Sequence, residues 1–146
     1  ADARRAEEWV REAVAGGAKL LSGGQRAGNL LQPTVLTETG AEMRVNCQEI
    51  FAPVVTVEGY EDFEAALERV NDSAYGLQAG VFTRDAGRLF QAYERLEVGG
   101  VIAGDIPSFR VDAMPYGGIK DSGLGREGLR YAMEEMTERK LLVMAV

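Results

Sequence analysis

The 146-residue sequence predicts an α/β fold in which a mostly parallel sheet is flanked by helices. Short apolar and β-branched runs alternate with segments whose apolar residues recur at helical spacing. From residue 50 to residue 103 the two kinds of segment follow one another at the spacing of parallel βαβ units. The length suits one domain or a large piece of a longer protein, and a hydrophobic content of 46% allows a packed core.

The N-terminal part begins with an amphipathic helix over residues 2–15, which Gly16 and Gly17 end. Charged residues fill most of this helix, and its apolar side carries Ala6, Trp9, Val10, Ala13 and Val14. Two short apolar pieces follow at 18–21 and 30–36, separated by a glycine-rich turn.

The middle of the chain predicts alternating strands and helices. Strands are predicted at 50–57, 79–83 and 98–103. One helix opens at residue 61 or 62, and Asp85 caps the next. The apolar faces of the two helices carry Phe63, Ala66, Leu67, Val70, Ala86, Leu89, Phe90, Tyr93 and Leu96. Right-handed crossovers would place both helices against the sheet.

The C-terminal part predicts a loop, a helix and an apolar strand. The loop from Asp105 to Gly125 is rich in glycine, and loops of this length are usually functional or pack against another part of the molecule. The helix spans about 126–137, with an inward face of Leu129, Met133 and Met136. The strand from Lys140 to Val146 is either sandwiched in a sheet or is an edge that pairs with a partner.

Composition and charge exclude several classes of function. Sixteen Lys and Arg against 23 Asp and Glu give a net charge of −7, which repels phosphate backbones, so we expect no nucleic-acid partner. No apolar run is long enough to span a bilayer, so no membrane partner is expected either. The sequence has no histidine, which excludes histidine-activated nucleophiles and histidine-ligated zinc. Cys47 is the single cysteine, which rules out a cysteine-rich metal site and suggests the cytoplasm.

Two features could carry chemistry, and each also has a plain structural interpretation. Residues 123–128 spell G-x-G-x-x-G at a helix start, which suits either a pyrophosphate cradle or a glycine turn. Because Glu127 would oppose a phosphate and no strand leads directly into the motif, the turn is favoured. Lys120 and Arg126 flank it and would either hold an anion or satisfy nearby carbonyl oxygens. Cys47 lacks a histidine base, which favours a buried structural thiol over a nucleophile.

Glu49 and Phe51 form a further candidate at the start of the predicted strand 50–57. Residues two apart in a strand project to the same face. An ionised carboxylate accepts hydrogen bonds from hydroxyl groups, so an acid beside an aromatic suits a sugar that carries a flat ring. The alternative is a solvated carboxylate beside a core phenylalanine.

Several motifs, taken together and in order, resemble the aldehyde dehydrogenase superfamily. They are Gln48–Val54 (Q-E-I-F-A-P-V), 74–77 (A-Y-G-L), 81–83 (V-F-T), 98–101 (V-G-G-V) and 115–128 (P-Y-G-G-I-K-D-S-G-L-G-R-E-G). The resemblance covers nearly the whole chain and is to the C-terminal part of these enzymes, which oxidise aldehydes to acids with NAD or NADP. It implies that the reactive cysteine, the general-base glutamate and the cofactor domain lie upstream, so Cys47 is not the nucleophile.

The resemblance implies roles for four residues. Glu49 matches the glutamate whose carboxylate holds the nicotinamide ribose, and Phe51 matches the aromatic residue beside the nicotinamide. Tyr116 matches the aromatic residue that lines the substrate entrance, and Phe109 lies where substrate-contacting loop residues usually fall. No catalytic residue and no metal ligand is implied within the chain.

The expected function is that of the C-terminal part of an NAD(P)-dependent aldehyde dehydrogenase. Residues 1–138 would belong to its catalytic domain, and residues 139–146 would form a strand that joins subunits into a homo-oligomer. The complete enzyme would bind NAD or NADP and a small aldehyde, whereas this chain alone is expected to turn over no aldehyde and to bind neither cofactor tightly. One alternative is a stand-alone, non-catalytic relative that acts as an interaction module, and a weaker one is a nucleotide-binding module built on the glycine loop.

Three positions depart from the family pattern. Gln48 replaces a glutamate and removes one charge. Ala52 replaces a glycine, which predicts strain if the backbone there has a positive φ. Gly104 replaces an asparagine, which removes an amide and predicts a looser loop.

Overall fold

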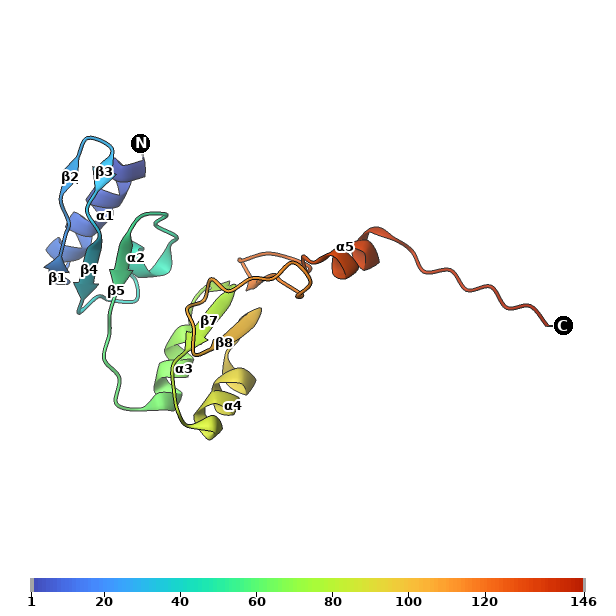
Figure 1. Cartoon of the computed structure of the whole chain (residues 1–146). Helices are drawn as coiled ribbons and strands as arrows, with labels where there is room; N and C mark the ends of the chain where they lie inside the picture. Colours follow the sequence, from blue (N-terminus) through green and yellow to red (C-terminus); the bar gives the residue numbers. More distant parts are fainter. Residues whose placement is uncertain (1, 146) are drawn as a thin grey trace. The chain divides into compact units, whose positions relative to one another are not determined.

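The computed structural model describes residues 2–145, and the chain divides after Glu61 into two compact units (Figure 1). The first unit contains, in chain order, α1 (Asp2–Ala15), β1 (Lys19–Ser22), β2 (Arg26–Ala27), β3 (Leu30–Leu31), β4 (Thr34–Thr37), α2 (Arg44–Cys47) and β5 (Val54–Thr56). β4 pairs antiparallel with β1 and parallel with β5, which gives the sheet order β1-β4-β5. β2 and β3 form a separate antiparallel pair.

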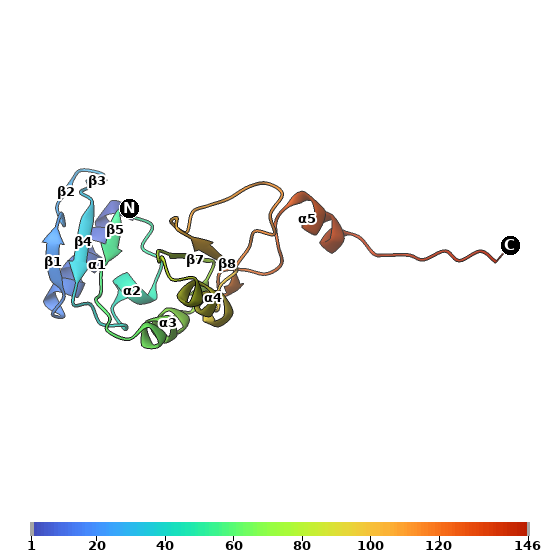
Figure 2. The ribbon, with the colours of Figure 1, turned by 60° about the horizontal axis from the view of Figure 1, so that its bottom comes forward.

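The core of the first unit lies between α1 and this sheet, which run side by side in Figures 1 and 2. Val10 and Ala13 of α1 cluster there with Leu36 of β4, whose side chain is fully buried. The predicted helix bounds of 2–15 are confirmed. Most of the predicted apolar face is also buried, whereas Val14 at its edge is exposed.

The predicted strand 50–57 is shorter than expected, because β5 spans only Val54–Thr56. Phe51 has a φ of 48°, which lies in the left-handed region and is incompatible with a strand. Pro53 has no amide hydrogen to donate to a ladder. The extended conformation therefore starts only after Pro53.

The second unit contains α3 (Phe63–Asn71), β6 (Tyr75–Gly76), β7 (Gln78–Val81), α4 (Ala86–Arg95), β8 (Gly100–Ala103), β9 (Ile119–Lys120) and α5 (Leu129–Met136). β7, α4 and β8 form a parallel βαβ unit, as predicted. β6 and β9 pair antiparallel.

Both predicted N-caps are confirmed. Asp62 Oδ1 accepts a hydrogen bond from the Ala65 amide at 2.7 Å, and Asp85 Oδ1 accepts one from the Arg88 amide at 3.2 Å. These bonds satisfy amide groups that the first turn of a helix leaves without a partner. Asp62 rather than Glu61 therefore opens α3.

The core of the second unit lies between the two helices and the β7–β8 pair, so both helices pack against the sheet as predicted. Its buried residues are Leu67, Ala92 and Leu96, with Phe63, Ala79, Val81, Val98 and Val101 packed around them. Ala92 was not predicted as part of this face. Val70, Phe90 and Tyr93 were predicted to face inward but are exposed. The buried stripe is narrower than predicted, because each helix contacts only a two-stranded sheet.

The prediction of a mostly parallel sheet is not confirmed. Among the described strands, β4–β5 and β7–β8 pair parallel, while β1–β4, β2–β3 and β6–β9 pair antiparallel. The predicted strands near 50–57 and 79–83 fall in separate units and do not share a sheet. None of the helices within residues 2–145 is long and apolar enough to cross a membrane.

The C-terminal helix and strand differ most from the prediction. α5 begins at Leu129 rather than near residue 126, and its predicted inward residues Leu129, Met133 and Met136 are exposed. The segment 139–145 forms no strand, and Val146 lies outside the described residues (Figure 1). A strand needs a neighbour for its amide and carbonyl groups, and no described residue provides one here.

Candidate cofactor and substrate residues

Glu49 and Phe51 lie in the irregular segment between α2 and β5. Both residues are exposed. Phe51 has 79% of its surface accessible to solvent, so it is not a core residue. The argument that strand alternation puts both on one face is wrong, because this segment is not a strand. The exposed carboxylate and ring are nevertheless open to a ligand.

Three hydrogen bonds fix the backbone around this segment. Arg5 Nη2 donates to the Ile50 carbonyl oxygen at 3.1 Å, and the Thr34 amide donates to the Pro53 carbonyl oxygen at 2.8 Å. The Val54 amide donates to the Ala52 carbonyl oxygen at 2.7 Å. Ala52 is not among the described residues with positive φ, so the strain predicted for replacing glycine there is absent.

Phe109 and Tyr116 lie in the long loop of the second unit. The Phe109 carbonyl oxygen accepts a hydrogen bond from Gln78 Nε2 at 3.1 Å, which ties the loop to β7. Arg110 lies over the Tyr116 ring at 5.0 Å from its centre and forms an ion pair with Glu127 at 2.9 Å. The Tyr116 and Glu127 backbones also exchange hydrogen bonds in both directions. The loop therefore holds Tyr116 and Arg110 together.

The glycine loop 123–128 forms a turn, and a backbone amide of this turn already donates to a carboxylate. The Arg126 amide donates to Glu135 Oε1 at 3.0 Å. A Cβ at Gly125, where φ is 72°, would lie 2.5 Å from the other Glu135 carboxylate oxygen. A phosphate at this position would meet the same carboxylate. The geometry therefore favours the glycine turn over the nucleotide-binding module.

Lys120 and Arg126 bond to carbonyl oxygens rather than presenting an open anion site. Lys120 Nζ donates to the carbonyl oxygens of Asn71 at 2.5 Å and Ser73 at 3.2 Å, and pairs with Glu97 at 2.9 Å. Arg126 Nη1 donates to the carbonyl oxygens of Gly118 at 3.0 Å and Gly125 at 2.7 Å. Lys120 thereby links β9 to the end of α3.

Replacing Lys120 with methionine is expected to lower the free energy of unfolding by about 1 to 2 kcal/mol, because two carbonyl oxygens and one carboxylate lose a charged donor. Urea unfolding followed by far-UV circular dichroism measures the change. Lys140→Met, in the exposed C-terminal segment, removes the same charge and is the matched control. Equal unfolding midpoints for the two variants would contradict the linking role of Lys120.

Cys47 is exposed, so the prediction of a buried structural thiol is wrong. It ends the short helix α2, and its Sγ lies 3.4 Å from the Glu42 carbonyl oxygen. Arg44, the nearby cation on α2, is engaged elsewhere. It pairs with both carboxylate oxygens of Glu12, and this hydrogen bonding raises the pKa of Arg44 and lowers the pKa of Glu12.

Sequence reasoning missed the side chains that hold these loops, namely Arg5, Gln78 and Arg110. Arg5 and Ile50 are 45 positions apart, and Gln78 and Phe109 are 31 apart. No local pattern signals such contacts. The candidate residues themselves fall in two pairs, Glu49 with Phe51 in the first unit and Phe109 with Tyr116 in the second.

Comparison with known proteins places the chain in a family. The profile of the aldehyde dehydrogenase family matches residues 1–142. The chain is 49% identical over 143 residues to the 3-sulfolactaldehyde dehydrogenase of Priestia megaterium, covering 98% of this chain and 30% of that protein. It is 43% identical over 141 residues to the lactaldehyde dehydrogenase of Methanococcus aeolicus, covering 97% of this chain and 30% of that protein.

Solved structures give the same result. Aldehyde dehydrogenase 21 of Physcomitrella patens, in complex with the reaction product succinate, superimposes with a TM-score of 0.95 at 51% identity, over 98% of this chain and 30% of that one. Glyceraldehyde-3-phosphate dehydrogenase GapN of Methanocaldococcus jannaschii, complexed with NADP, gives a TM-score of 0.87 at 41% identity, over 92% and 29%. The chain spans about 30% of the length of the relatives that it matches, and it belongs to the aldehyde dehydrogenase family.

Proposed function

We propose that this chain is the C-terminal part of an NAD(P)-dependent aldehyde dehydrogenase and contributes to both its cofactor site and its aldehyde site. The observation that carries the proposal is the match over 98% of the chain to aldehyde dehydrogenase 21, at 51% identity. Residues 1–138 belong to the catalytic domain and residues 139–146 to the subunit interface. The nucleophilic cysteine and the general base come from outside these residues.

The cofactor contribution comes from Glu49 and Phe51. The Glu49 carboxylate accepts hydrogen bonds from the nicotinamide ribose hydroxyls, and Phe51 packs beside the nicotinamide. The exposure of both side chains supports these roles, and one structural neighbour was solved with NADP. When bound, the dinucleotide accepts the hydride that leaves the substrate. The task of these two residues is orientation, which lowers the barrier by fixing the reacting groups in place.

The aldehyde contribution comes from the loop of Phe109, Arg110 and Tyr116. Relatives are named for 3-sulfolactaldehyde, sulfoacetaldehyde and aspartate semialdehyde, and a structural neighbour holds succinate. Each of these compounds carries a sulfonate or carboxylate. Arg110 is half exposed beside the Tyr116 ring and pairs with Glu127 at 2.9 Å. A guanidinium binds such anions in a bidentate manner, so a substrate anion would bind Arg110 in place of the Glu127 carboxylate. These observations support a small aldehyde with an anionic group as the substrate, although other relatives are named for lactaldehyde, which carries no charge.

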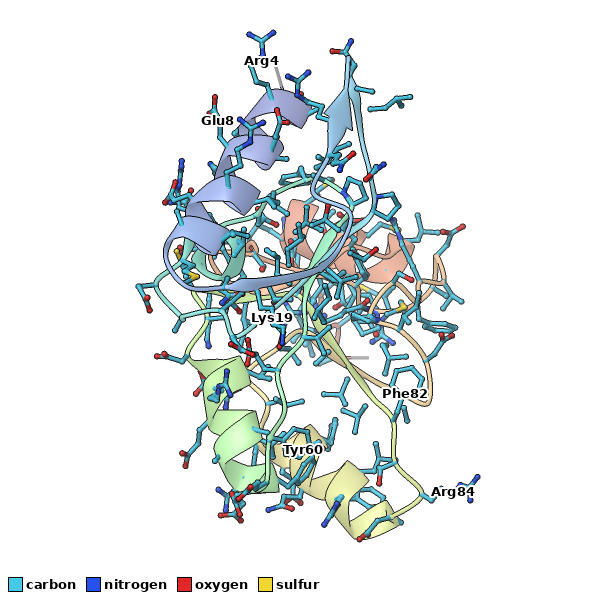
Figure 3. All side chains as sticks on the ribbon, turned by 90° about the vertical axis from the view of Figure 1, so that its left-hand side faces the viewer. Arg4, Glu8, Lys19, Tyr60, Phe82 and Arg84 are labelled. Atoms are coloured by element: carbon cyan, nitrogen blue, oxygen red, sulfur yellow. The ribbon has the colours of Figure 1, made fainter. Side chains whose placement is uncertain are left out.

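Arg110→Met in the full-length protein is expected to raise KM for sulfolactaldehyde or succinic semialdehyde about tenfold or more, because the substrate anion loses one charged hydrogen-bonding partner. KM for uncharged propionaldehyde should not change. Arg84→Met is the control, because Arg84 belongs to the same unit and points outward before α4 (Figure 3). Equal effects on the charged and uncharged aldehydes would contradict a role in anion binding.

The proposed function is tested by comparing two proteins in one spectrophotometric assay. The full-length protein that contains this segment should reduce NAD or NADP when an aldehyde is added. The 146-residue chain should produce no turnover and show no tight cofactor binding by calorimetry. Reduction by the short chain would contradict a nucleophile outside it, and no activity of the full-length protein with any aldehyde would overturn the function itself.

The C-terminal segment supports assembly with a second copy of the chain. Leu141, Leu142, Val143 and Met144 keep between 75% and 85% of their surface accessible. Exposed apolar residues with unpaired backbone groups form a strand when another strand pairs with them. The same segment also supports the alternative function, a non-catalytic relative that works as an interaction module.

Deleting residues 139–146 is expected to convert an oligomer into a monomer, because the deletion removes both the apolar surface and the pairing groups. Light scattering coupled to size exclusion measures the mass. Lys140→Met keeps the segment apolar and should leave the oligomer intact. A monomer before deletion, or an unchanged mass after it, would contradict assembly through this segment.

A further inference from the structure

We propose that Arg5 is a positioning residue that fixes the cofactor loop, defined here as residues 48–51. Arg5 lies on α1, and its Nη2 donates to the Ile50 carbonyl oxygen at 3.1 Å. Ile50 stands between Glu49 and Phe51, so this hydrogen bond holds the Ile50–Phe51 peptide, next to both candidate cofactor residues. The effect on the cofactor rests on the proposed function, whereas the effect on the loop does not.

Arg5 is itself held in place by Trp9, one helical turn further along α1. The Arg5 guanidinium lies 5.3 Å from the centre of the Trp9 ring, and the Arg44 guanidinium lies 5.0 Å from it. The Trp9 ring is buried, whereas Arg5 and Arg44 are partly exposed, so each cation–π contact is expected to be weaker than a fully desolvated one. The Arg5–Trp9–Arg44 cluster thus joins α1 to α2.

The cluster controls the cofactor loop from both ends. Arg44 begins α2, whose C-cap Gln48 is the first residue of the loop. Glu12 fixes Arg44, because its carboxylate accepts a hydrogen bond from Arg44 Nε at 3.1 Å and a second one from Nη2. Arg5 then fixes the loop close to its other end, through the Ile50 carbonyl oxygen. The loop has little freedom left while the cluster is intact.

The backbone of Phe51 shows why such a clamp is needed. Its φ of 48° is rare for a residue with a bulky side chain and costs conformational energy. Such a conformation persists only when surrounding contacts impose it. The Arg5 bond sets the orientation of the Ile50–Phe51 peptide, and without it Phe51 would relax to an extended conformation and move its ring.

The chemistry of Arg5 indicates a specific role rather than general stabilisation. Arg5 Nε is buried and has no hydrogen-bond partner within the described part of the chain. A buried donor without a partner lowers stability. An apolar side chain of similar length would pack against Trp9 without that cost. What Arg5 supplies here, and an apolar side chain cannot, is the bond to the Ile50 carbonyl oxygen.

The first test measures the loop in the 146-residue chain by hydrogen exchange. Arg5→Met is expected to speed exchange of the amides of residues 48–52 about tenfold, as for a segment that opens locally. Arg5→Lys, which keeps a charged donor group on a shorter side chain, should lie between the wild type and Arg5→Met. Arg4→Met is the matched control, because Arg4 points away from α1 near Glu8 (Figure 3). Exchange at the wild-type rate in both Arg5 variants would overturn the proposal.

The single tryptophan and the single cysteine make folding visible in the same samples. Trp9 emission reports whether α1 stays packed, and the rate at which Cys47 reacts with a thiol reagent reports on α2. If Arg5→Met unfolds the first unit, the emission of Trp9 will shift to that of an exposed indole. The less disruptive Arg5→Lys variant then decides the question, and a wild-type exchange rate in it would count against the clamp.

The second test uses the full-length enzyme and separates positioning from a loss of folded protein. Arg5→Met is expected to raise KM for NAD(P) about tenfold, with KM for the aldehyde unchanged. A merely structural role would lower the active fraction, and thus kcat, without moving KM for the cofactor. An unchanged KM for NAD(P) would overturn the positioning role. If the wild-type enzyme reduces no NAD(P), the proposed function fails, and the exchange experiment still decides whether Arg5 fixes the loop.

Discussion

Replacing Gly99 with alanine is expected to destabilise the second unit by about 3 kcal/mol, at the upper end of overpacking effects. A Cβ at Gly99 would overlap the Gly117 carbonyl oxygen and lie 2.8 Å from the Gly117 carbonyl carbon. It would also lie 3.0 Å from the Leu77 carbonyl oxygen. All of these are backbone atoms, which cannot rotate away as a flexible side chain can.

The close approach at Gly99 also supports the candidate substrate loop. The Gly99 amide donates to the Gly76 carbonyl oxygen at 3.0 Å, which places the start of β8 beside β6. On its other side Gly99 contacts the backbone next to Tyr116. The alanine variant is therefore expected to loosen the 105–125 loop as well as the β7–β8 pair.

Hydrogen exchange resolved by segment measures this effect, because Trp9 reports only on the first unit. Amides within 62–136 should exchange faster in Gly99→Ala, while Trp9 emission stays that of the wild type. Gly59→Ala is the control, since a Cβ there would meet no atom within 4 Å. Wild-type exchange in the second unit would show that the Gly99 contact is not a constraint on the fold.

The elements that could be predicted from the sequence are those whose causes are local. α1 has its apolar face and its glycine stop within one segment, and α3 and α4 carry their capping aspartates next to the first turn. The β7-α4-β8 unit also depends on residues close in sequence. In each case the stabilising partner lies within a few turns of chain, so periodicity and capping rules suffice.

The elements that were wrong are those whose pattern does not specify a partner nearby in the sequence. α5 and the segment 139–145 carry apolar patterns typical of buried structure, yet most of their large apolar side chains are exposed. An apolar pattern predicts that a surface will be buried, but it does not predict which element will bury it. The mostly parallel sheet failed for a related reason, because pairing between strands depends on contacts that no single segment encodes.

Two of the three departures from the family pattern have simple backbone explanations. Ala52 avoids a positive φ, so its Cβ is tolerated. Gly104 has a φ of 73°, in the region that glycine adopts freely and asparagine adopts more readily than most residues. Glycine in place of asparagine therefore keeps the turn. The roles of Glu49, Phe51, Phe109 and Tyr116 came from ordered motifs, and neither periodicity nor spacing would have assigned them.

Replacing Glu49 with glutamine in the full-length enzyme is expected to raise KM for NAD(P) by about tenfold to a hundredfold. Hydrogen bonds to a charged group contribute about 1.5 to 3 kcal/mol, and each 1.4 kcal/mol is about tenfold in affinity. Glutamine has nearly the same shape but carries no charge, and an NH2 donor replaces one of its two acceptor oxygens, so its hydrogen bonds to the two ribose hydroxyls are weaker. Cofactor KM from initial rates, with fluorescence titration for the binding constant, measures the change.

A double variant separates the position of the carboxylate from its charge. Gln48→Glu combined with Glu49→Gln keeps the net charge of the loop and moves the acid by one residue. Gln48 is the C-cap of α2, with a φ of −132° and a ψ of 153°, so its side chain leaves the backbone in a different direction from that of its neighbour. The double variant is therefore expected to bind NAD(P) as weakly as Glu49→Gln alone. Recovery of wild-type affinity would mean that the loop attracts the cofactor through its overall charge, and that Glu49 makes no specific contact with the ribose.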